Sequence, residues 1–382
     1  MDFSAIAKHS EQRIADKILV GCSTDVHING ESVWSSCHGY ADIDAGIKVD
    51  DNSVFRLASM TKPITGVAVM QLVENGKVGL EDKITKYLPE FNDFSIGAFD
   101  ENRNIKSVRK ASRPFTVYDI LTHSSGFIQG DIGFTYWGSH AEIRPAEGDT
   151  LATALPKLKN VPMDADPGTA IGYGAHSTFD LLGLIVEMAT GMKYSEYLQK
   201  NIFDPLGMVD TTFHPTDAQR ARAVMVYTAD GTIHPAPGRE VHQAMYGFPE
   251  TYEGGSCGLY STKADYIRFA ECLLNRGTLD GVRILKPETV DYMGTTQTKP
   301  NMAGYNPVQN WGISMRVIQS HDPACVLPYG TYGWSGAYGT HFIVCPEYNL
   351  TAVYMSNMMN GGGSGAPTAF EFERDIMDQV KK

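Results

Sequence analysis

Ser59 and Lys62, in the run Ser59-Met60-Thr61-Lys62, have types and spacing that propose chemistry. Residues three positions apart share one face of a helix, so the lysine amine can reach the serine hydroxyl. A serine hydroxyl is a weak nucleophile until a neighbouring base takes its proton. A lysine acts as that base only where burial or a nearby cation keeps it partly neutral. The pair therefore indicates an acyl-enzyme mechanism, with Ser59 as nucleophile and Lys62 as proton acceptor.

The segment that must position this pair is typical of a helix. Apolar residues recur at helical spacing from Ile64 to Leu72, and Gly76 is a suitable stop. Pro63 fits a helix only within its first turn, which places Ser59 at the N-terminus. There the helix dipole and free backbone N–H groups favour a developing oxyanion. A serine at this position is also a good N-cap, so these residues alone leave the catalytic and capping interpretations open.

A second serine repeats the spacing in Ser107-Val108-Arg109-Lys110. Such a pattern is expected about once by chance in a chain of this length. Basic residues crowd positions 103–113, and no apolar periodicity accompanies them. We therefore interpret this stretch as an exposed basic segment whose lysine is solvated and charged.

A third serine lies in Gly254-Gly255-Ser256-Cys257-Gly258, which matches the G-x-S-x-G nucleophile elbow. Asp322 and His341 follow it in the order of a hydrolase triad. An elbow needs a buried strand before the serine and a helix directly after it, and neither is indicated here. We interpret this segment as a glycine loop beside a site.

The elements around these residues indicate an antiparallel sheet built from both ends of the chain. A helix opens the chain, and strands at 18–28 and 31–40 flank the turn pair Asn29-Gly30. Towards the other end we expect strands at 311–318, 341–345 and 350–355, a glycine-rich stretch at 360–365 and a last helix at 366–382. Hairpins at both ends without β-α-β alternation favour an α+β fold.

The middle of the chain is predicted to be mainly helical. Periodicity and glycine stops indicate helices at 116–126, 177–191 and 193–203, and 92–113 resembles an exposed loop or an insertion. Asp180 and Asp265 each follow a Ser or Thr by three positions, which indicates capping boxes. We expect residues 1–80 and 225–382 to form the sheet domain, and residues 81–224 to form a helical domain inserted into it.

Composition excludes several classes of function. The 382 residues carry a net charge of −12 with no basic run, which argues against a nucleic-acid partner. We expect no membrane span, no secretory signal and hence a cytoplasmic protein. Six scattered cysteines lack zinc-site spacing, and no nucleotide-binding motif occurs, so we expect no metal and no cofactor.

Taken in order along the chain, these features resemble the serine β-lactamase and penicillin-binding protein superfamily. Ser59 and Lys62 take the first motif place, Tyr173 takes the second, and Trp334-Ser335-Gly336 takes the third. The resemblance runs from about residue 5 to the last helix and includes HGYADIDAG, FRLASMTKP, ILTHSSGF, GLYSTKADYIRFAECLL and LDGVRIL. Within the superfamily the chain looks most like family VIII carboxylesterases and class C-like transesterases.

The resemblance implies a β-lactamase/transpeptidase-like fold and a role for each motif. Ser59 would be acylated, Lys62 would accept its proton, and the Tyr173 hydroxyl would relay protons to the leaving group and from the deacylating water. The backbone N–H groups of Ser59 and Ala337 would form the oxyanion hole. The expected substrate-binding and oxyanion residues are Trp334, Ser335, Gly336 and Ala337.

Two departures from the superfamily pattern bear on the substrate. Position 334 usually carries a cation that holds a substrate carboxylate, and here it is Trp334, which has no charge. The second motif usually reads Tyr-x-Asn, and here Ala175 replaces the amide, with His176 one position too far to substitute for it. Both departures favour an uncharged ester over β-lactam or D-Ala-D-Ala substrates.

We therefore expect a serine hydrolase that cleaves small-molecule esters through an acyl-enzyme on Ser59. Alternatives on the same fold are a β-lactamase, an amide or D-peptide hydrolase and an acyltransferase. A more distant alternative is a non-catalytic relative that serves binding or assembly. Substrate preference and oligomeric state lie beyond what the sequence indicates.

Overall fold

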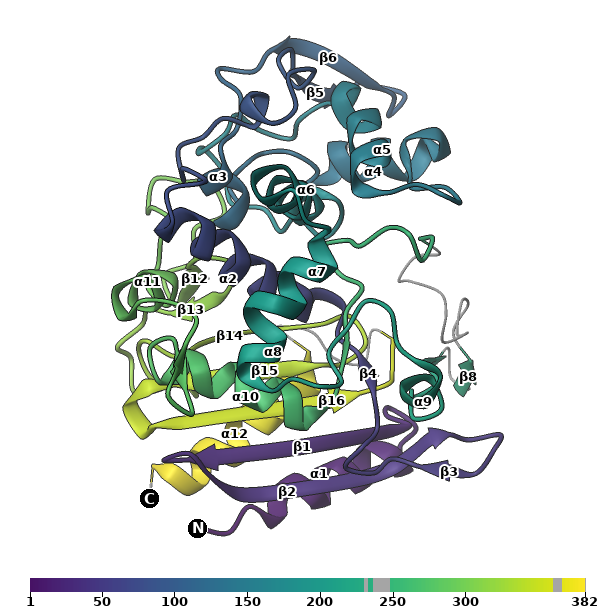
Figure 1. Ribbon diagram of the computed structural model, residues 1–382, viewed down its shortest axis with the longest axis vertical. Helices are drawn as coiled ribbons and strands as arrows, with labels where there is room; N and C mark the ends of the chain where they lie inside the picture. Colours follow the sequence, from purple (N-terminus) through teal and green to yellow (C-terminus); the bar gives the residue numbers. More distant parts are fainter. Residues whose placement is uncertain (230–232, 236–247, 360–365, 382) are drawn as a thin grey trace.

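The centre of the protein is a sheet to which both ends of the chain contribute. The computed structural model describes residues 1–229, 233–235, 248–359 and 366–381. Within these ranges, eight antiparallel strands pair in the order β12-β13-β14-β15-β16-β1-β2-β3 (Figure 1). They are β1 (Gly21–Ile28), β2 (Glu31–Asp42), β3 (Ile47–Lys48), β12 (Gln309–Trp311), β13 (Arg316–Ile318), β14 (Tyr332–Ser335), β15 (His341–Cys345) and β16 (Leu350–Ser356). The predicted α+β class with an antiparallel sheet is confirmed.

The hairpin predicted at the start of the chain is confirmed. Asn29 and Gly30 have φ values of 55° and 79°, both in the left-handed region that a type I′ turn requires. The first strand also pairs with the last one, because Cys22 lies opposite Ser356 and Ile28 lies opposite Leu350. This pairing joins the strands from the two ends of the chain into one sheet.

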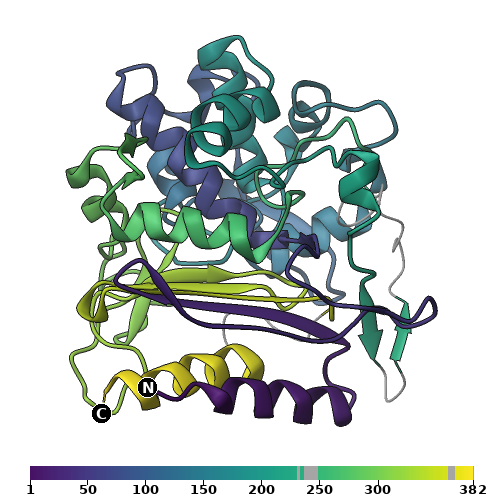
Figure 2. The ribbon, with the colours of Figure 1, turned by 60° about the horizontal axis from the view of Figure 1, so that its bottom comes forward.

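Helices cover both faces of the sheet. Figure 2 shows the first and last helices, α1 (Ser4–Ala15) and α12 (Pro367–Val380), side by side under one face. They are joined by an ion pair between Arg13 and Glu371, with Nε and Oε2 3.0 Å apart. The other face carries α10 (Lys263–Leu274) and, above it, α2 (Thr61–Glu74). The predicted last helix is thus found, and the glycine-rich stretch 360–365 before it lies outside the described residues.

The region between the first strands and the rest of the sheet contains short helices. They are α3 (Val117–Leu121), α4 (Asp131–Ser139), α5 (Leu151–Ala154), α6 (Thr178–Thr190), α7 (Tyr194–Leu198), α8 (Asp204–Leu206) and α9 (Asp217–Arg220). Smaller elements elsewhere are α11 (Pro287–Met293) and the strand pairs β4 (Phe55–Arg56) with β9 (Tyr260–Ser261), β7 (Tyr227–Ala229) with β8 (Ile233–Pro235), and β10 (Thr278–Leu279) with β11 (Val282–Arg283). The division into a sheet domain and an inserted domain stays a prediction.

Two local predictions are wrong. The stretch 92–113 is not a loop but contains a hairpin of β5 (Ser95–Phe99) and β6 (Ile105–Lys110). Because β6 is exposed along almost its whole length, it lacks the apolar alternation that reveals a strand. The stretch 311–318 is two strands, since a turn at 312–315 separates β12 from β13. Ile313 and Ser314 donate their N–H groups outside the sheet, to Met293 O at 3.0 Å and Leu121 O at 2.8 Å.

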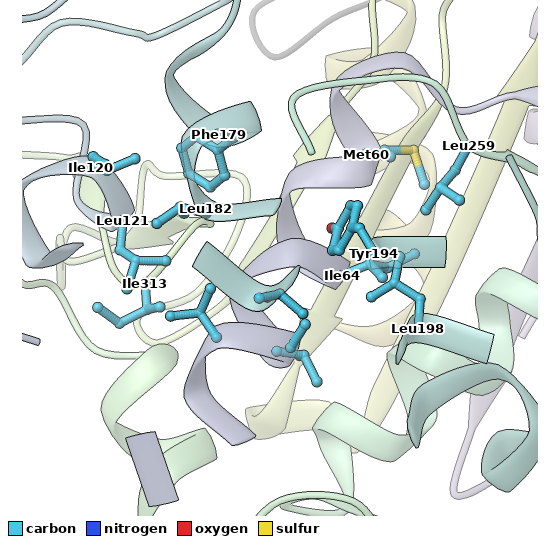
Figure 3. Close-up of a cluster of buried hydrophobic side chains, with 14 of the residues drawn as sticks. Met60, Ile64, Ile120, Leu121, Phe179, Leu182, Tyr194, Leu198, Leu259 and Ile313 are labelled. Carbon is cyan, nitrogen blue, oxygen red and sulfur yellow. The ribbon is translucent and has the colours of Figure 1, made fainter. Parts of the chain in front are cut away.

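The main core surrounds α2, which is buried on every side from residue 61 to 72. A helix that is apolar all round belongs in an interior rather than on a surface. Figure 3 shows part of this core, with side chains from α2, α3, α6 and α7 meeting; the labelled residues are Met60, Ile64, Ile120, Leu121, Phe179, Leu182, Tyr194, Leu198, Leu259 and Ile313. Residues 59–62 are therefore buried in this core. Across the ranges that the structure describes, no helix combines the length and apolar character needed to cross a bilayer.

Candidate active site

Ser59 and Lys62 lie where a tight turn runs into the buried helix α2. A 3₁₀ turn covers Ala58–Met60, and α2 starts at Thr61, so Lys62 lies in its first turn. The Lys62 Nζ donates a hydrogen bond to Ser59 Oγ at 3.2 Å. The lysine side chain is fully buried, and Ser59 is 9% exposed. The structure thus brings together the two residues that the sequence analysis paired.

Two backbone carbonyls fix the position of the Lys62 amine. Its Nζ donates to Ser256 O at 2.8 Å and to Ala175 O at 3.4 Å, in addition to Ser59. Three acceptors therefore surround the amine, which fixes its position and keeps it aimed at the serine hydroxyl.

The loop that supplies the Ser256 carbonyl is held by Asp180 on α6. One oxygen of this fully buried carboxyl group accepts the Ser256 N–H at 2.7 Å, and the other accepts the Tyr252 hydroxyl at 2.7 Å. Burial raises the pKa of Asp180, and these hydrogen bonds offset part of that rise. Thr65 on α2 also binds the loop, donating to Gly255 O at 2.7 Å.

Asp180 is one of the residues at the site whose contacts the sequence did not indicate. Its position three residues after Ser177 predicted a capping box, and that prediction is wrong. Ser177 has a left-handed backbone, with φ at 57°, and its side chain does not cap α6. The other predicted box is half formed: Thr262 accepts the Asp265 N–H at 3.2 Å, but Asp265 binds the Asp210 N–H and the Thr211 hydroxyl instead. Both acids lie in the same S/T-x-x-D pattern, so the pattern could not distinguish an acid that caps its helix from one that binds distant residues.

Tyr173 lies beside the amine but is not bonded to it. The Lys62 Nζ is 5.0 Å from the centre of the Tyr173 ring. The Tyr173 oxygen instead accepts the indole N–H of Trp334 at 3.1 Å. Within the described part of the chain, no hydrogen bond joins the Tyr173 hydroxyl to Ser59 or Lys62. Catalytic hydrogen bonds are often long before substrate binds, so this spacing is compatible with the role of proton relay.

Three partly exposed aromatic rings form one wall of the site. The rings of Tyr173 and Trp311 are stacked with centres 5.7 Å apart, and those of Trp311 and Trp334 meet edge to face at 4.5 Å. Trp311, at the end of β12, was not among the predicted site residues. Its only sequence signal was membership of the stretch predicted as a strand. The wall is apolar and carries no formal charge.

The third motif splits between the two faces of the sheet. Trp334 on β14 faces Tyr173, whereas the next side chain, Ser335, is buried on the other face, with Oγ 2.7 Å from His341 Nδ1. His341 Nε2 lies 3.1 Å from Glu373 on α12. Burial raises the pKa of Glu373, but the charge of Arg316 and the contact with His341 lower it to about 2. The Ser335 hydroxyl is therefore engaged away from Ser59, and its predicted role in substrate binding stays a prediction.

Gly336 packs closely against the start of the 3₁₀ turn that contains Ser59. A Cβ atom added at Gly336 would lie 2.2 Å from Leu57 O, so the end of β14 lies directly against this turn. Thr340 fixes the same carbonyl by donating its hydroxyl to Leu57 O at 2.9 Å. The oxyanion role of Ser59 and Ala337 stays a prediction.

The two alternative serines lie in unsuitable surroundings. Ser107 is exposed on β6 and its Oγ is 2.7 Å from Ser95 Oγ, while Lys110 forms an ion pair with Asp93 at 2.8 Å. Ser256 is fully buried, and His341, which follows it in triad order, is engaged with Ser335 and Glu373, as described above. Among the described residues, no group of three or more His, Cys, Asp or Glu side chains is arranged to hold a metal ion.

Comparisons with known proteins agree with this fold and identify a family. The family model described as Beta-lactamase matches residues 6–371. An uncharacterised protein of Mycobacterium tuberculosis (strain CDC 1551 / Oshkosh) is 34% identical, over 83% of this chain and 80% of its own length. Esterase EstB of Burkholderia gladioli is 29% identical, over 94% and 91%. A solved structure of EstCE1, named as a hydrolase with promiscuous acyltransferase activity, shares the fold, with a TM-score of 0.78, 23% identity and coverage of 100% and 99%.

Proposed function

The chain belongs to the β-lactamase family, and from that premise we propose that it is a serine hydrolase that cleaves uncharged carboxylic esters through an acyl-enzyme on Ser59. The observation that supports the choice of an ester is the hydrogen bond that Trp334 donates. Its indole N–H is already donated to Tyr173, so Trp334 brings neither charge nor a free donor to a substrate carboxylate. The similarity to a named esterase over nearly the whole chain supports the same choice.

The proposed reaction has two halves. The Ser59 oxygen attacks the ester carbonyl carbon while its proton passes to the Lys62–Tyr173 pair. The tetrahedral oxyanion is held by the backbone N–H groups of Ser59 and Ala337. The carbon–oxygen bond to the alcohol then breaks, and the alcohol leaves with the proton that the pair returns. In the second half water adds to the acyl carbon and loses a proton to the pair. The bond between the acyl carbon and the Ser59 oxygen then breaks, the pair returns the proton to that oxygen, and the acid leaves.

The experiment measures turnover and covalent labelling together. Wild type, Ser59→Ala and the matched variant Ser256→Ala are incubated with p-nitrophenyl esters, a chromogenic cephalosporin and a D-alanine amide. We expect ester turnover and an acyl mass increment in wild type and Ser256→Ala, and neither in Ser59→Ala. Retained activity in Ser59→Ala with loss in Ser256→Ala would show that the nucleophile is wrongly assigned.

The same panel tests the substrate class. Cephalosporin turnover without ester cleavage would overturn the argument from Trp334. Repeating the ester reaction with added alcohol separates hydrolysis from acyl transfer, because transfer appears as a new ester. Replacement by a cation, Trp334→Lys, should shift preference towards an ester that carries a carboxylate, since one added charge about 4 Å from another at a partly buried site contributes up to about 4 kcal/mol.

A further inference from the structure

His123 accepts hydrogen bonds from the backbone on both sides of Tyr173. Its backbone oxygen accepts the Gly172 N–H at 3.0 Å, and its side-chain Nδ1 accepts the Gly174 N–H at 3.1 Å. The two donors are the residues immediately before and after Tyr173. One residue therefore holds the segment that carries the phenol at two points, from a position 50 residues earlier in the chain.

The His123 ring also supports the Tyr173 ring. The ring centres of His123 and Tyr173 are 4.9 Å apart, and that of Trp311 is 4.0 Å from His123. His123 is fully buried behind these two partly exposed rings. It therefore lies underneath the aromatic wall, in contact with the part of the wall that is proposed to move protons.

The protonation state of His123 suits this contact. Burial, and secondarily the charge of Lys62, lower the pKa of His123 well below its usual value. The ring is therefore neutral, Nδ1 keeps the lone pair that accepts the Gly174 N–H, and the proton resides on Nε2. The Nε2 atom is buried and has no hydrogen-bond partner among the described residues. The His123 imidazole therefore leaves one buried donor unpaired, which costs stability.

The His123 backbone is left-handed. Its φ of 54° lies in a region that few non-glycine residues adopt, although histidine adopts it more readily than most. The unpaired buried donor indicates that this residue is kept for more than packing. Its hydrogen bonds to Gly172 and Gly174 indicate that the Tyr173 segment is what it supports.

We propose that His123 is a positioning residue for Tyr173, holding the phenol in the orientation from which it passes a proton to the leaving alcohol. This proposal rests on the proposed function, because it takes Tyr173 as the proton relay of the Ser59 reaction. His123 itself does not touch the substrate. Its effect should therefore fall on the steps in which Tyr173 moves a proton, and most strongly on delivery to the leaving alcohol.

Leaving-group dependence isolates that step. A p-nitrophenyl ester releases a stable anion that needs little protonation, whereas an aliphatic ester of the same acid needs a proton on its alcohol. In His123→Leu, which lacks the acceptor, we expect kcat/KM to fall about 10- to 100-fold more on the aliphatic ester than on the p-nitrophenyl ester. Tyr173→Phe should show the same selective loss, and the double variant should lose no more than Tyr173→Phe alone.

The conservative variant tests the hydrogen bond itself. In His123→Asn the amide oxygen reaches the place of Nδ1, and asparagine tolerates a left-handed backbone, so we expect it to restore the aliphatic ester to within a few-fold of wild type. Thermal unfolding of each variant checks that the losses do not come from unfolding. If His123→Leu fails to fold, His123→Gly replaces it, because glycine accepts this φ without strain.

Two results would overturn the proposal. One is equal loss on both esters in His123→Leu, and the other is additive loss in the double variant; either would assign His123 a purely structural role. Failure of the proposed function has a different signature, namely acyl labelling that persists in Ser59→Ala. Absence of leaving-group selectivity in Tyr173→Phe would reject the relay role of Tyr173 and this proposal with it.

Discussion

Replacing Asp180 should damage catalysis through a hydrogen-bond path, and the chain contains a matched control. Asp180 accepts one backbone N–H and one hydroxyl, each at 2.7 Å. Asp265 has the same inventory, with the Asp210 N–H at 2.7 Å and the Thr211 hydroxyl at 2.8 Å. Both acids are buried, and both follow a Ser or Thr by three positions. They differ in that Asp180 holds the loop whose carbonyl binds the Lys62 amine.

The magnitude follows from the groups left unpaired. In Asp180→Ala and in Asp265→Ala, two donors lose their acceptor at about 1–3 kcal/mol each, partly offset because a carboxyl group no longer has to be buried. We expect both variants to lose about 2–4 kcal/mol of unfolding free energy. In Asp180→Ala the Ser256 carbonyl is also free to move, and an error of about 1 Å in the position of a catalytic group costs about 100-fold in rate.

Two measurements separate stability from catalysis. Urea denaturation gives the unfolding free energies, and kcat on a p-nitrophenyl ester is measured at a temperature where all variants remain folded. We expect similar destabilisation in the two variants and a fall in kcat confined to Asp180→Ala. If the two variants lose activity equally, or if Asp180→Ala keeps the wild-type kcat, the path from Asp180 through Ser256 to Lys62 is refuted.

Two further predictions concern Gly336 at the end of β14 and the free energy of unfolding at high pH. Gly336→Ala would put a Cβ atom 2.2 Å from Leu57 O, so the strand end must move; we expect the acylation burst to slow about 100-fold, and an unchanged burst would contradict this packing. Burial lowers the pKa of His27, but its hydrogen bonds to Asp25 and Glu271 raise it to about 9 from 6.5. Because the folded-state pKa is the higher one, this stabilisation of about 3 kcal/mol is full below pH 6.5 and is lost as pH rises through 9. Urea unfolding of wild type and His27→Gln should therefore differ at pH 6 and converge near pH 10, and a constant difference would refute the assignment.

Features encoded by neighbouring residues were predictable from the sequence. The Asn29-Gly30 turn requires two left-handed residues in succession, and few residue pairs supply them. The position of Pro63 in the first turn of α2 follows from its missing N–H, and it locates Ser59 and Lys62. Each of these inferences uses interactions within about one turn of chain, where sequence spacing and spatial distance agree.

Features that depend on distant partners were not predictable. Asp180 looked like a cap because its real partners, Tyr252 and Ser256, lie 72 and 76 residues away. Trp311 joins the aromatic wall because a turn at 312–315 ends β12 there, and donors in that turn bind Met293 and Leu121. The hairpin of β5 and β6 was not predicted because the side chains of β6 are almost all exposed. Tertiary contacts decided all three.

The contacts of the Lys62 amine carry a consequence for how the protein is made. The nucleophile and its base are synthesised early, but the carbonyls that aim the amine belong to residues 113 and 194 positions further along the chain. The strand end that lies against the turn containing Ser59 comes later still, at Gly336. A nascent chain that displays Ser59 therefore lacks the groups that position the proposed nucleophile. The proposed acylation becomes possible only after most of the chain has left the ribosome and folded, so such activity would report a folded molecule.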